Sequence, residues 1–129
     1  MVWIVAAGSA LGGVARYLVG GLVQRLAGPV FPLGTLVVNT IGSIVIGFVM
    51  RYALESAAIS AEARTFLTIG ICGGFTTFST FSYETVALFQ DGSYGKAAAS
   101  IAANVGLALL GTVAGAALAG AVWDWRRIG

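Results

Sequence analysis

The sequence has few charged side chains, no histidine and a single cysteine. Charged residues make up 9% of its 129 positions, and the cysteine is Cys72. A soluble domain carries about 25% charged residues. The scarcity of charge therefore excludes a disordered chain and a nucleic-acid binder built on basic patches, so no nucleic-acid partner is expected. One cysteine without histidine excludes an internal disulfide and a Cys/His metal site.

The same scarcity argues against an enzyme. General acid–base and nucleophilic catalysis rely on histidine, paired carboxylates or an activated nucleophile, and the sequence offers none of these arrangements. The seven basic and five acidic residues leave a net charge of +2, which indicates no polyanionic partner.

Apolar residues are what the chain has in abundance. They make up 58% of the sequence, and the mean hydropathy is +0.93. A helix needs about 20 mainly apolar residues to cross a bilayer. Four blocks meet this need, at about residues 2–25, 31–51, 65–90 and 97–123. We expect one domain over residues 1–129, an all-α membrane protein with four transmembrane helices in the cell (inner or plasma) membrane.

The basic residues are divided between the two ends of these spans. Four spans place both termini on one side of the membrane. That side carries four arginines and the opposite side one arginine and one lysine, namely Arg51, Arg64, Arg126, Arg127 against Arg25, Lys96. Because the positive-inside rule counts only Lys and Arg, this bias is weak and indicates insertion in either orientation.

Glycine is twice as frequent as usual, with 19 residues. Small-xxx-small pairs recur, among them Gly8 with Gly12 and Gly111 with Gly115. Such pairs let helix backbones approach closely in lipid, and helix packing is their ordinary role. Because four short helices enclose little volume, a transport pathway is expected between subunits.

Polar residues inside the spans are costly and often functional. Thr35, Asn39 and Ser43 follow one another at intervals of four, which places them on one helix face. Ser100 and Asn104 repeat the interval in the last span. The hydroxyls can bond back to their own helix, but an unpaired carboxamide costs several kcal/mol in hydrocarbon, so each asparagine needs a neighbouring helix, a water or an ion.

The third span contains the least helical stretch. The pair Gly73-Gly74, followed by Thr76-Thr77, is a poor helix former and predicts a break in the middle of the membrane. Unwound backbone at this depth is tolerated only where protein or an ion pathway covers it, and broken helices are a recurring way to bind ions.

Two aromatics and two charges accompany this stretch. Phe78 and Phe81 are three residues apart, so a helix resuming after the break sets them on one face among hydroxyls; ordinary packing or lipid contact is the alternative. Glu84 lies in the same span, and Arg16 is the only other charge inside a span. The two charges either pair or each face water.

These motifs together resemble the CrcB/Fluc fluoride channel family. The resemblance rests on the segment GGFTTFSTFS at 73–82 with Glu84 after it, on Gly-x-x-x-Arg at 12–16, and on Pro-x-Gly-Thr-x-x-x-Asn at 32–39. It covers essentially the whole chain in order, and the TTFSTFS segment is its most specific part.

The resemblance implies an antiparallel, dual-topology homodimer in a prokaryotic membrane, with the third helix broken and two fluoride pathways along the subunit interface. It implies that Phe78 and Phe81 line each pathway with their ring edges and that Asn39 donates amide protons to fluoride. Gly73 and Thr76 then hold a structural sodium ion through backbone carbonyls. The other pathway residues are Ser43, Ser79, Thr80, Glu84, Ser100 and Asn104, with Arg16 as a charge near the site. Ala108 stands where some relatives carry a serine.

The implied chemistry agrees with the residues. Fluoride is strongly hydrated, so its desolvation must be offset by preorganised donors. The positive edge of an aromatic ring attracts an anion without trapping it as a lysine would.

Two other functions compete with a passive channel. A proton-coupled small-ion or small multidrug-type exporter is similarly short, but that class needs a glutamate in the first helix, which offers only Arg16. A non-catalytic assembly subunit leaves the TTFSTFS segment without a role.

Overall fold

The computed structural model describes residues 1–56 and 59–128, and the regular structure in these residues is entirely helical. The elements are α1 (Val2–Ala27), α2 (Leu33–Glu55), α3 (Ala61–Thr65), the π-helical segment η1 (Phe66–Cys72), α4 (Gly73–Phe75), α5 (Phe78–Gln90) and α6 (Tyr94–Ile128). The predicted all-helical fold is confirmed.

Three of the four predicted spans are single helices, α1, α2 and α6, each long and apolar enough to cross a membrane. The other is a composite of α3, η1, α4 and α5, which runs from Ala61 to Gln90 and is interrupted at Thr76 and Thr77. The helices extend beyond the apolar blocks; α6, for example, has 35 residues and continues through the charged residues after Trp123.

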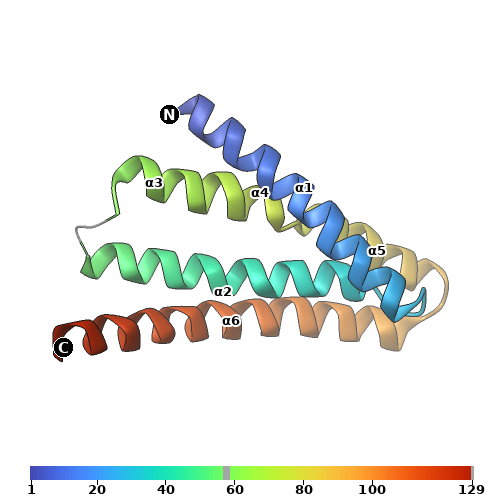
Figure 1. Cartoon of the computed structure of the whole chain (residues 1–129). Helices are drawn as coiled ribbons and strands as arrows, with labels where there is room; N and C mark the ends of the chain where they lie inside the picture. The colour runs from blue at the N-terminus through green and yellow to red at the C-terminus, as the bar shows by residue number, and fades with distance from the viewer. Residues whose placement is uncertain (57–58, 129) are drawn as a thin grey trace.

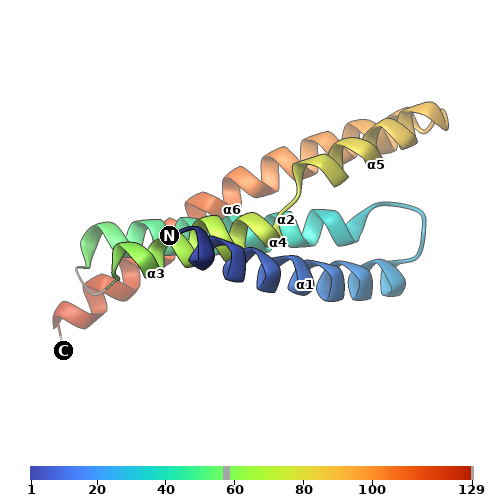
Figure 2. The same ribbon diagram turned by 90° about the horizontal axis from the view of Figure 1, so that it is seen from above.

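The helices form an elongated bundle in which α2 and α6 lie side by side along most of their length (Figure 1). Helix α1 crosses the bundle obliquely against η1 and α4, and α5 lies along the first part of α6 (Figure 2). The starts of α1 and α3 and the ends of α2 and α6 lie at one end of the bundle, and the connections from α1 to α2 and from α5 to α6 lie at the opposite end (Figure 1). This is the arrangement expected of an even number of spans.

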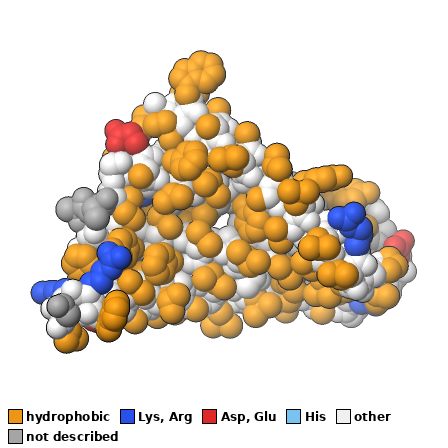
Figure 3. Space-filling model, in the orientation of Figure 1, with side chains coloured by type: hydrophobic (Ala, Val, Ile, Leu, Met, Phe, Trp, Pro, Cys, Tyr) orange, Lys and Arg blue, Asp and Glu red, His pale blue; other side chains and the backbone are white. Residues whose placement is uncertain are grey.

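The surface of the bundle is almost entirely apolar between its ends. Hydrophobic side chains cover the face seen in Figure 3, and the blue and red charged side chains gather at its margins. The exposed residues include Leu110, Val113 and Leu118 on α6. A surface of this kind is stable against lipid rather than water, which agrees with a membrane-spanning protein.

Glycines allow α1 to touch the third span backbone to backbone. A Cβ atom added at Gly8 would lie 2.7 Å from the Cα of Gly70, and one added at Gly74 would lie 2.6 Å from the carbonyl oxygen of Ser9. At Gly12 an added Cβ would overlap the carbonyl oxygen of Ile71. The seam between α1 and the segment from η1 to α4 therefore requires residues without side chains, as predicted for Gly8 and Gly12.

The interruption of the third span lies three residues later than the glycine pair suggests. Gly73 and Gly74 form the helical turn α4, and the backbone becomes extended only at Thr76 (φ −84°, ψ 160°) and Thr77 (φ −152°, ψ 114°). The expected break at Gly73-Gly74 is thus corrected. Gly74 keeps a helical conformation because its role is close contact with α1, whereas the Thr77 backbone finds hydrogen-bond partners outside its own helix.

Candidate functional site

The candidate site is built around the extended Thr76–Thr77 segment between α4 and α5. The Thr76 amide still donates to the Cys72 carbonyl at 2.9 Å, so the helix ends there. The hydroxyl of Thr77 accepts a hydrogen bond from the Thr80 amide at 3.1 Å and donates to the Thr80 hydroxyl at 2.9 Å. Thr77 therefore caps the first turn of α5 at the point where the helix resumes.

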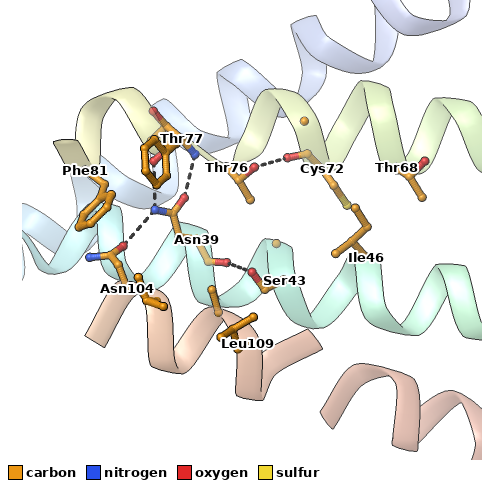
Figure 4. A pocket seen from close by; sticks show the side chains of 15 residues that line it. Asn39, Ser43, Ile46, Thr68, Cys72, Thr76, Thr77, Phe81, Asn104 and Leu109 are labelled. Carbon is orange, nitrogen blue, oxygen red and sulfur yellow. Dashed lines mark hydrogen bonds between the residues drawn. The ribbon is translucent and has the colours of Figure 1, made fainter. Parts of the chain in front are cut away.

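Asn39 of α2 lies against this segment and bonds both sides of one residue. Its Oδ1 accepts from the Thr77 amide at 2.7 Å, and its Nδ2 donates to the Thr77 carbonyl at 3.0 Å. The same Nδ2 donates to Oδ1 of Asn104 on α6, also at 3.0 Å (Figure 4). A buried asparagine in a membrane span needs hydrogen-bond partners on a neighbouring helix. Asn39 has such partners on α6 and on the interrupted third span.

Two cavities lie on either side of the interruption, and Thr77 lines both of them. The first has a volume of about 430 Å³ and is mainly apolar, with Ser43, Phe78 and Phe81 among its lining residues (Figure 4). The second has a volume of about 740 Å³, is more polar, and is lined in part by Arg16.

The polar stripe of α2 runs from one cavity to the other. Thr35 lines the second cavity, Asn39 bonds to the interruption, and Ser43 lines the first cavity. The Ser43 hydroxyl donates to the carbonyl of Asn39 at 2.7 Å, back to its own helix, which is the ordinary role of a hydroxyl on a buried helix.

Phe78 and Phe81 line the first cavity in contact with one another. Their ring centroids are 5.3 Å apart, and the rings meet edge to face at 69°. Phe81 is 7% exposed, whereas Phe78 is 77% exposed. The two rings therefore share a helix face as predicted, but the described residues of the chain cover only Phe81.

The polar residues of α6 are buried against α5 and α2. The hydroxyls of Ser100 and Thr85 lie 3.0 Å apart, and the side-chain amide of Asn104 donates to the Ser100 carbonyl at 3.1 Å. Ser100 is fully buried and lies outside both cavities. Asn104 and Ala108 line the first cavity, so the polar face of α6 ends at Asn104.

The two charges inside the spans have separate partners. Nη1 of Arg16 donates to the Thr76 carbonyl at 3.1 Å, and Oε1 of Glu84 accepts from the Thr35 hydroxyl at 2.9 Å. Both side chains line the second cavity, together with Arg25. Among the described residues the two charges form no ion pair with each other: Arg16 bonds to a backbone carbonyl and Oε1 of Glu84 to a hydroxyl, while Oε2 of Glu84 is buried without a hydrogen-bond partner.

The carbonyls of Gly73 and Thr76 have capacity for a cation. The amide that would bond Gly73 in a continuous helix, that of Thr77, is turned toward Asn39. The Thr76 oxygen accepts one bond from Arg16, and a carbonyl oxygen has a second lone pair. Across residues 1–56 and 59–128 no His, Cys, Asp and Glu side chains cluster as metal ligands. Backbone oxygen donors of this kind suit a hard monovalent cation.

The remaining expected residues divide between the cavities. Thr80 lines the second cavity, while Ser79 lies outside both and is 3.3 Å from the Thr77 hydroxyl. Thr77 and Thr85 were absent from the expected site. The signal for Thr77 is its place directly before the resumed helix, where a hydroxyl residue caps; nothing in the sequence distinguishes Thr85.

Comparison with known proteins extends these observations to the whole chain. Residues 3–116 match the family described as CrcB-like protein, Camphor Resistance (CrcB). The chain belongs to the CrcB family. The resemblance noted in the sequence is thereby confirmed, over spans that include every residue of both cavities.

Several curated members of the CrcB family are similar along nearly their full length. A protein of Geobacter sulfurreducens named fluoride-specific ion channel FluC is 53% identical over 111 residues, which cover 86% of this chain and 90% of the relative. Relatives of the same name from Thermus thermophilus and Rhizobium meliloti are 50% and 48% identical, over 91% and 89% of this chain and 96% and 92% of their own lengths. Their names describe ion channels, not enzymes.

Proposed function

We propose that this protein is a passive fluoride-selective channel that exports fluoride and lowers its cytoplasmic concentration. The observation that carries the proposal is the polar stripe of α2, which crosses the interrupted third span from one cavity to the other. We call the second cavity, which Arg16 lines, the polar cavity, and the first cavity, which Phe78 and Phe81 line, the aromatic cavity. We propose fluoride as the transported ion because the relatives are named fluoride-specific ion channels.

The aromatic cavity offers fluoride an environment with few competing interactions. Its polar groups are hydroxyls and carboxamides, and the rings of Phe78 and Phe81 meet edge to face. A ring edge carries positive charge, so an anion is attracted without a formal cation that would hold it too tightly. The path in our proposal consists of the ring edges of Phe78 and Phe81 with the polar side chains of Ser43, Asn39, Asn104, Thr80 and Glu84. Ser79 and Ser100 lie outside both cavities and adjoin the path through Thr77 and Asn104.

The polar cavity supplies the attraction that brings an anion to this path. Arg16 and Arg25 both line it, against one carboxylate, Glu84, whose Oε1 already accepts a bond from Thr35. Clefts lined by one sign of charge raise the local concentration of the opposite ion. We propose that the polar cavity is a hydrated vestibule of the fluoride path. Arg16 then lies at the inner end of this vestibule, next to Thr76.

We further propose that the working unit is an antiparallel homodimer with two pathways. Phe78, which lines the aromatic cavity, is 77% exposed, so this side of the cavity is open. A second copy would close that side and exclude lipid from the path. The weak charge bias of the sequence favours insertion in both orientations, which an antiparallel pair requires.

A sodium ion is the cofactor we propose, held by the carbonyls of Gly73 and Thr76 as a structural ion. When bound, it would supply positive potential beside the anion path. The chain's own contribution is twofold: the Gly73 carbonyl lacks its helical donor because the Thr77 amide is used by Asn39, and the Thr76 carbonyl keeps a second lone pair beside its bond from Arg16. We place the protein in a bacterial cell membrane, as a multi-pass protein.

The function is tested by fluoride efflux from liposomes that contain the purified protein. We expect fluoride to leave down its own gradient without any proton gradient, and chloride loaded in parallel liposomes to stay inside. Efflux that requires a proton gradient would support the proton-coupled exporter instead, and retention of fluoride under both conditions would overturn the channel.

A further inference from the structure

The side chain of Gln24 bridges the end of α1 and the start of α2. Its Nε2 donates to the carbonyls of Gly28 and Phe31, at 2.7 and 3.0 Å. Its Oε1 accepts from the Gly34 amide at 3.0 Å, and its backbone carbonyl accepts from the Gly28 amide at 3.0 Å. We call the three side-chain hydrogen bonds the Gln24 clamp, because they tie one residue of α1 to peptide groups along the whole connection to α2.

The clamp replaces the cap that α2 lacks. The residue before α2 is Pro32, which makes no side-chain cap, and Gly34 is buried. An amide in the first turn of a helix has no acceptor within its helix, so the Gly34 amide depends on a partner from elsewhere. A carboxamide is the side chain that sets two donor protons beside an acceptor oxygen. Turned over, the Gln24 amide would meet two carbonyls with its oxygen and an N–H with its protons, so the connection determines its orientation.

The clamp lies at one end of the polar cavity. Gln24, Arg25 and Gly34 all line this cavity. Arg16 lines it about two turns earlier on α1, about 12 Å along the helix axis, where it bonds to the interruption of the third span. Figure 2 shows the connection from α1 to α2 as a loop at the end of the bundle. The polar cavity therefore extends from the interruption to the clamp, and the clamp marks its mouth.

The clamp joins two groups of the polar cavity that belong to different helices. Arg25 follows Gln24 directly at the end of α1. Thr35 follows Gly34 directly at the start of α2, and its hydroxyl donates to Glu84 at 2.9 Å. Because the clamp bonds the residue before each of them, it fixes the position of Arg25 relative to the first residue of the α2 polar stripe.

We propose that Gln24 is a positioning residue for anion entry, whose clamp holds Arg25 and the start of the α2 polar stripe together at the mouth of the polar cavity. With the clamp intact, the positive charge of Arg25 stays at the mouth and raises the local concentration of fluoride. Without the clamp, the end of α1 is no longer tied to α2, and this charge moves with a loose helix end. The inference rests on the proposed function, because the mouth matters for transport only if the polar cavity is the fluoride vestibule.

The clamp itself is tested by hydrogen exchange of the Gly34 amide in Gln24→Leu, which has similar volume and no polar group. The matched control is Gln90→Leu, because Gln90 is the only other glutamine, is exposed at the end of α5 and lines neither cavity. We expect exchange at Gly34 to be at least about tenfold faster in Gln24→Leu and unchanged in Gln90→Leu. Unchanged exchange in Gln24→Leu, or equal acceleration in both variants, would overturn the clamp.

The role in transport is tested by removing one bond of the clamp while Gln24 stays in place. Replacing Gly34 by glycolic acid exchanges its N–H for an ester oxygen, and only the bond to Gln24 is lost, because a first-turn amide has no partner within its helix. The same replacement at Gly95 is the matched control, since Gly34 and Gly95 are the second residues of α2 and α6 and Gly95 is exposed. We expect the Gly34 ester to raise the half-saturating fluoride concentration at least about threefold and to change the maximal flux by less than about twofold. Equal half-saturating concentrations for the two esters would overturn the positioning role.

Ionic strength separates this role from a loss of structure. The screening length falls from about 10 Å at about 0.1 M salt to about 3 Å at about 1 M. When an impermeant salt is raised over this range, we therefore expect the Gly34 ester and the wild type to become more alike. A merely structural defect would instead lower the maximal flux at every salt concentration and leave the half-saturating concentration unchanged, which would overturn the positioning role. If the wild type conducts no fluoride, the proposed function fails and the role in anion entry falls with it, whereas exchange at Gly34 still decides whether the clamp exists.

Discussion

At the scale of single residues, the two phenylalanines of α5 show how one helix face holds side chains with different roles. Phe81 is buried inside the helix bundle, and Phe78 packs its ring against Phe81 while its other side is exposed at the surface. A substitution at Phe78 therefore alters the cavity wall with little effect on the core of the bundle.

The role of the ring edge is tested by Phe78→Ile. Isoleucine is bulky and apolar but has no positive edge, so we expect fluoride flux in liposomes to fall at least about tenfold, equivalent to about 1.4 kcal/mol of lost stabilisation. Phe89→Ile is the control, because Phe89 also meets a ring edge to face, that of Tyr94, outside both cavities. Wild-type flux in Phe78→Ile would contradict a role of the ring edge in transport and would leave side-chain packing as the only role of these rings.

At the scale of helices, the seam between α2 and α6 depends on glycine. An added Cβ at Gly115 would overlap the carbonyl oxygen of Ile44, and one at Gly47 would overlap that of Thr112. These neighbours are backbone atoms, which cannot move without separating the helices. Close backbone approach is what allows Asn39 on α2 to reach Asn104 on α6, so the seam supports the site directly.

Gly115→Ala tests this seam. Alanine improves helix propensity by about 1 kcal/mol, but we expect the overlap with Ile44 to dominate and to lower the free energy of unfolding by about 1–3 kcal/mol. The measurement is denaturant unfolding in detergent, followed by circular dichroism. Gly120→Ala on the same helix is the control, since nothing lies within 4 Å of its added Cβ. Equal stability of the two variants would contradict the close packing at Gly115.

At the scale of the whole molecule, the charges gather at the two ends of an apolar bundle (Figure 3). The end with the chain termini carries four of the seven basic residues and the opposite end carries two. The near balance of the two ends predicts that neither orientation in the membrane is strongly preferred.

Insertion in both orientations is tested with a tag on the C-terminus. We expect an impermeant reagent to label a substantial fraction of the tags from each side of the same membrane. Replacing Arg126 and Arg127 by Gln makes the basic count two against two, so the labelled fractions should become more nearly equal. Labelling from one side only, in both proteins, would contradict dual topology and the antiparallel dimer.

The proposed cation is tested by withdrawing sodium. Purification with a large organic cation in place of sodium should lower fluoride flux, because positive potential beside the path is lost, and flux should recover when sodium is returned. Arg16 stays on the Thr76 carbonyl in either condition, so partial flux is expected without sodium. Full flux throughout the exchange would contradict the sodium site.

The sequence by itself determined the all-helical fold and the three long apolar helices that could cross a membrane. Both follow from composition and from the spacing of charges, since an apolar stretch of about 20 residues is stable only in lipid. The stripe of Thr35, Asn39 and Ser43 on one face was likewise predictable, because helix periodicity is a local property. The family could also be recognised, since its motifs are short and contiguous.

Only the tertiary structure decided where the third span breaks and what the polar side chains do there. The partners of Asn39 are 38 and 65 residues away along the chain, and Arg16 reaches a carbonyl 60 residues away. Local propensity placed the break at the glycine pair, but both glycines stay helical and Gly74 packs against α1. The backbone opens at Thr77 instead, because that is where another helix presents a carboxamide to replace the missing bonds.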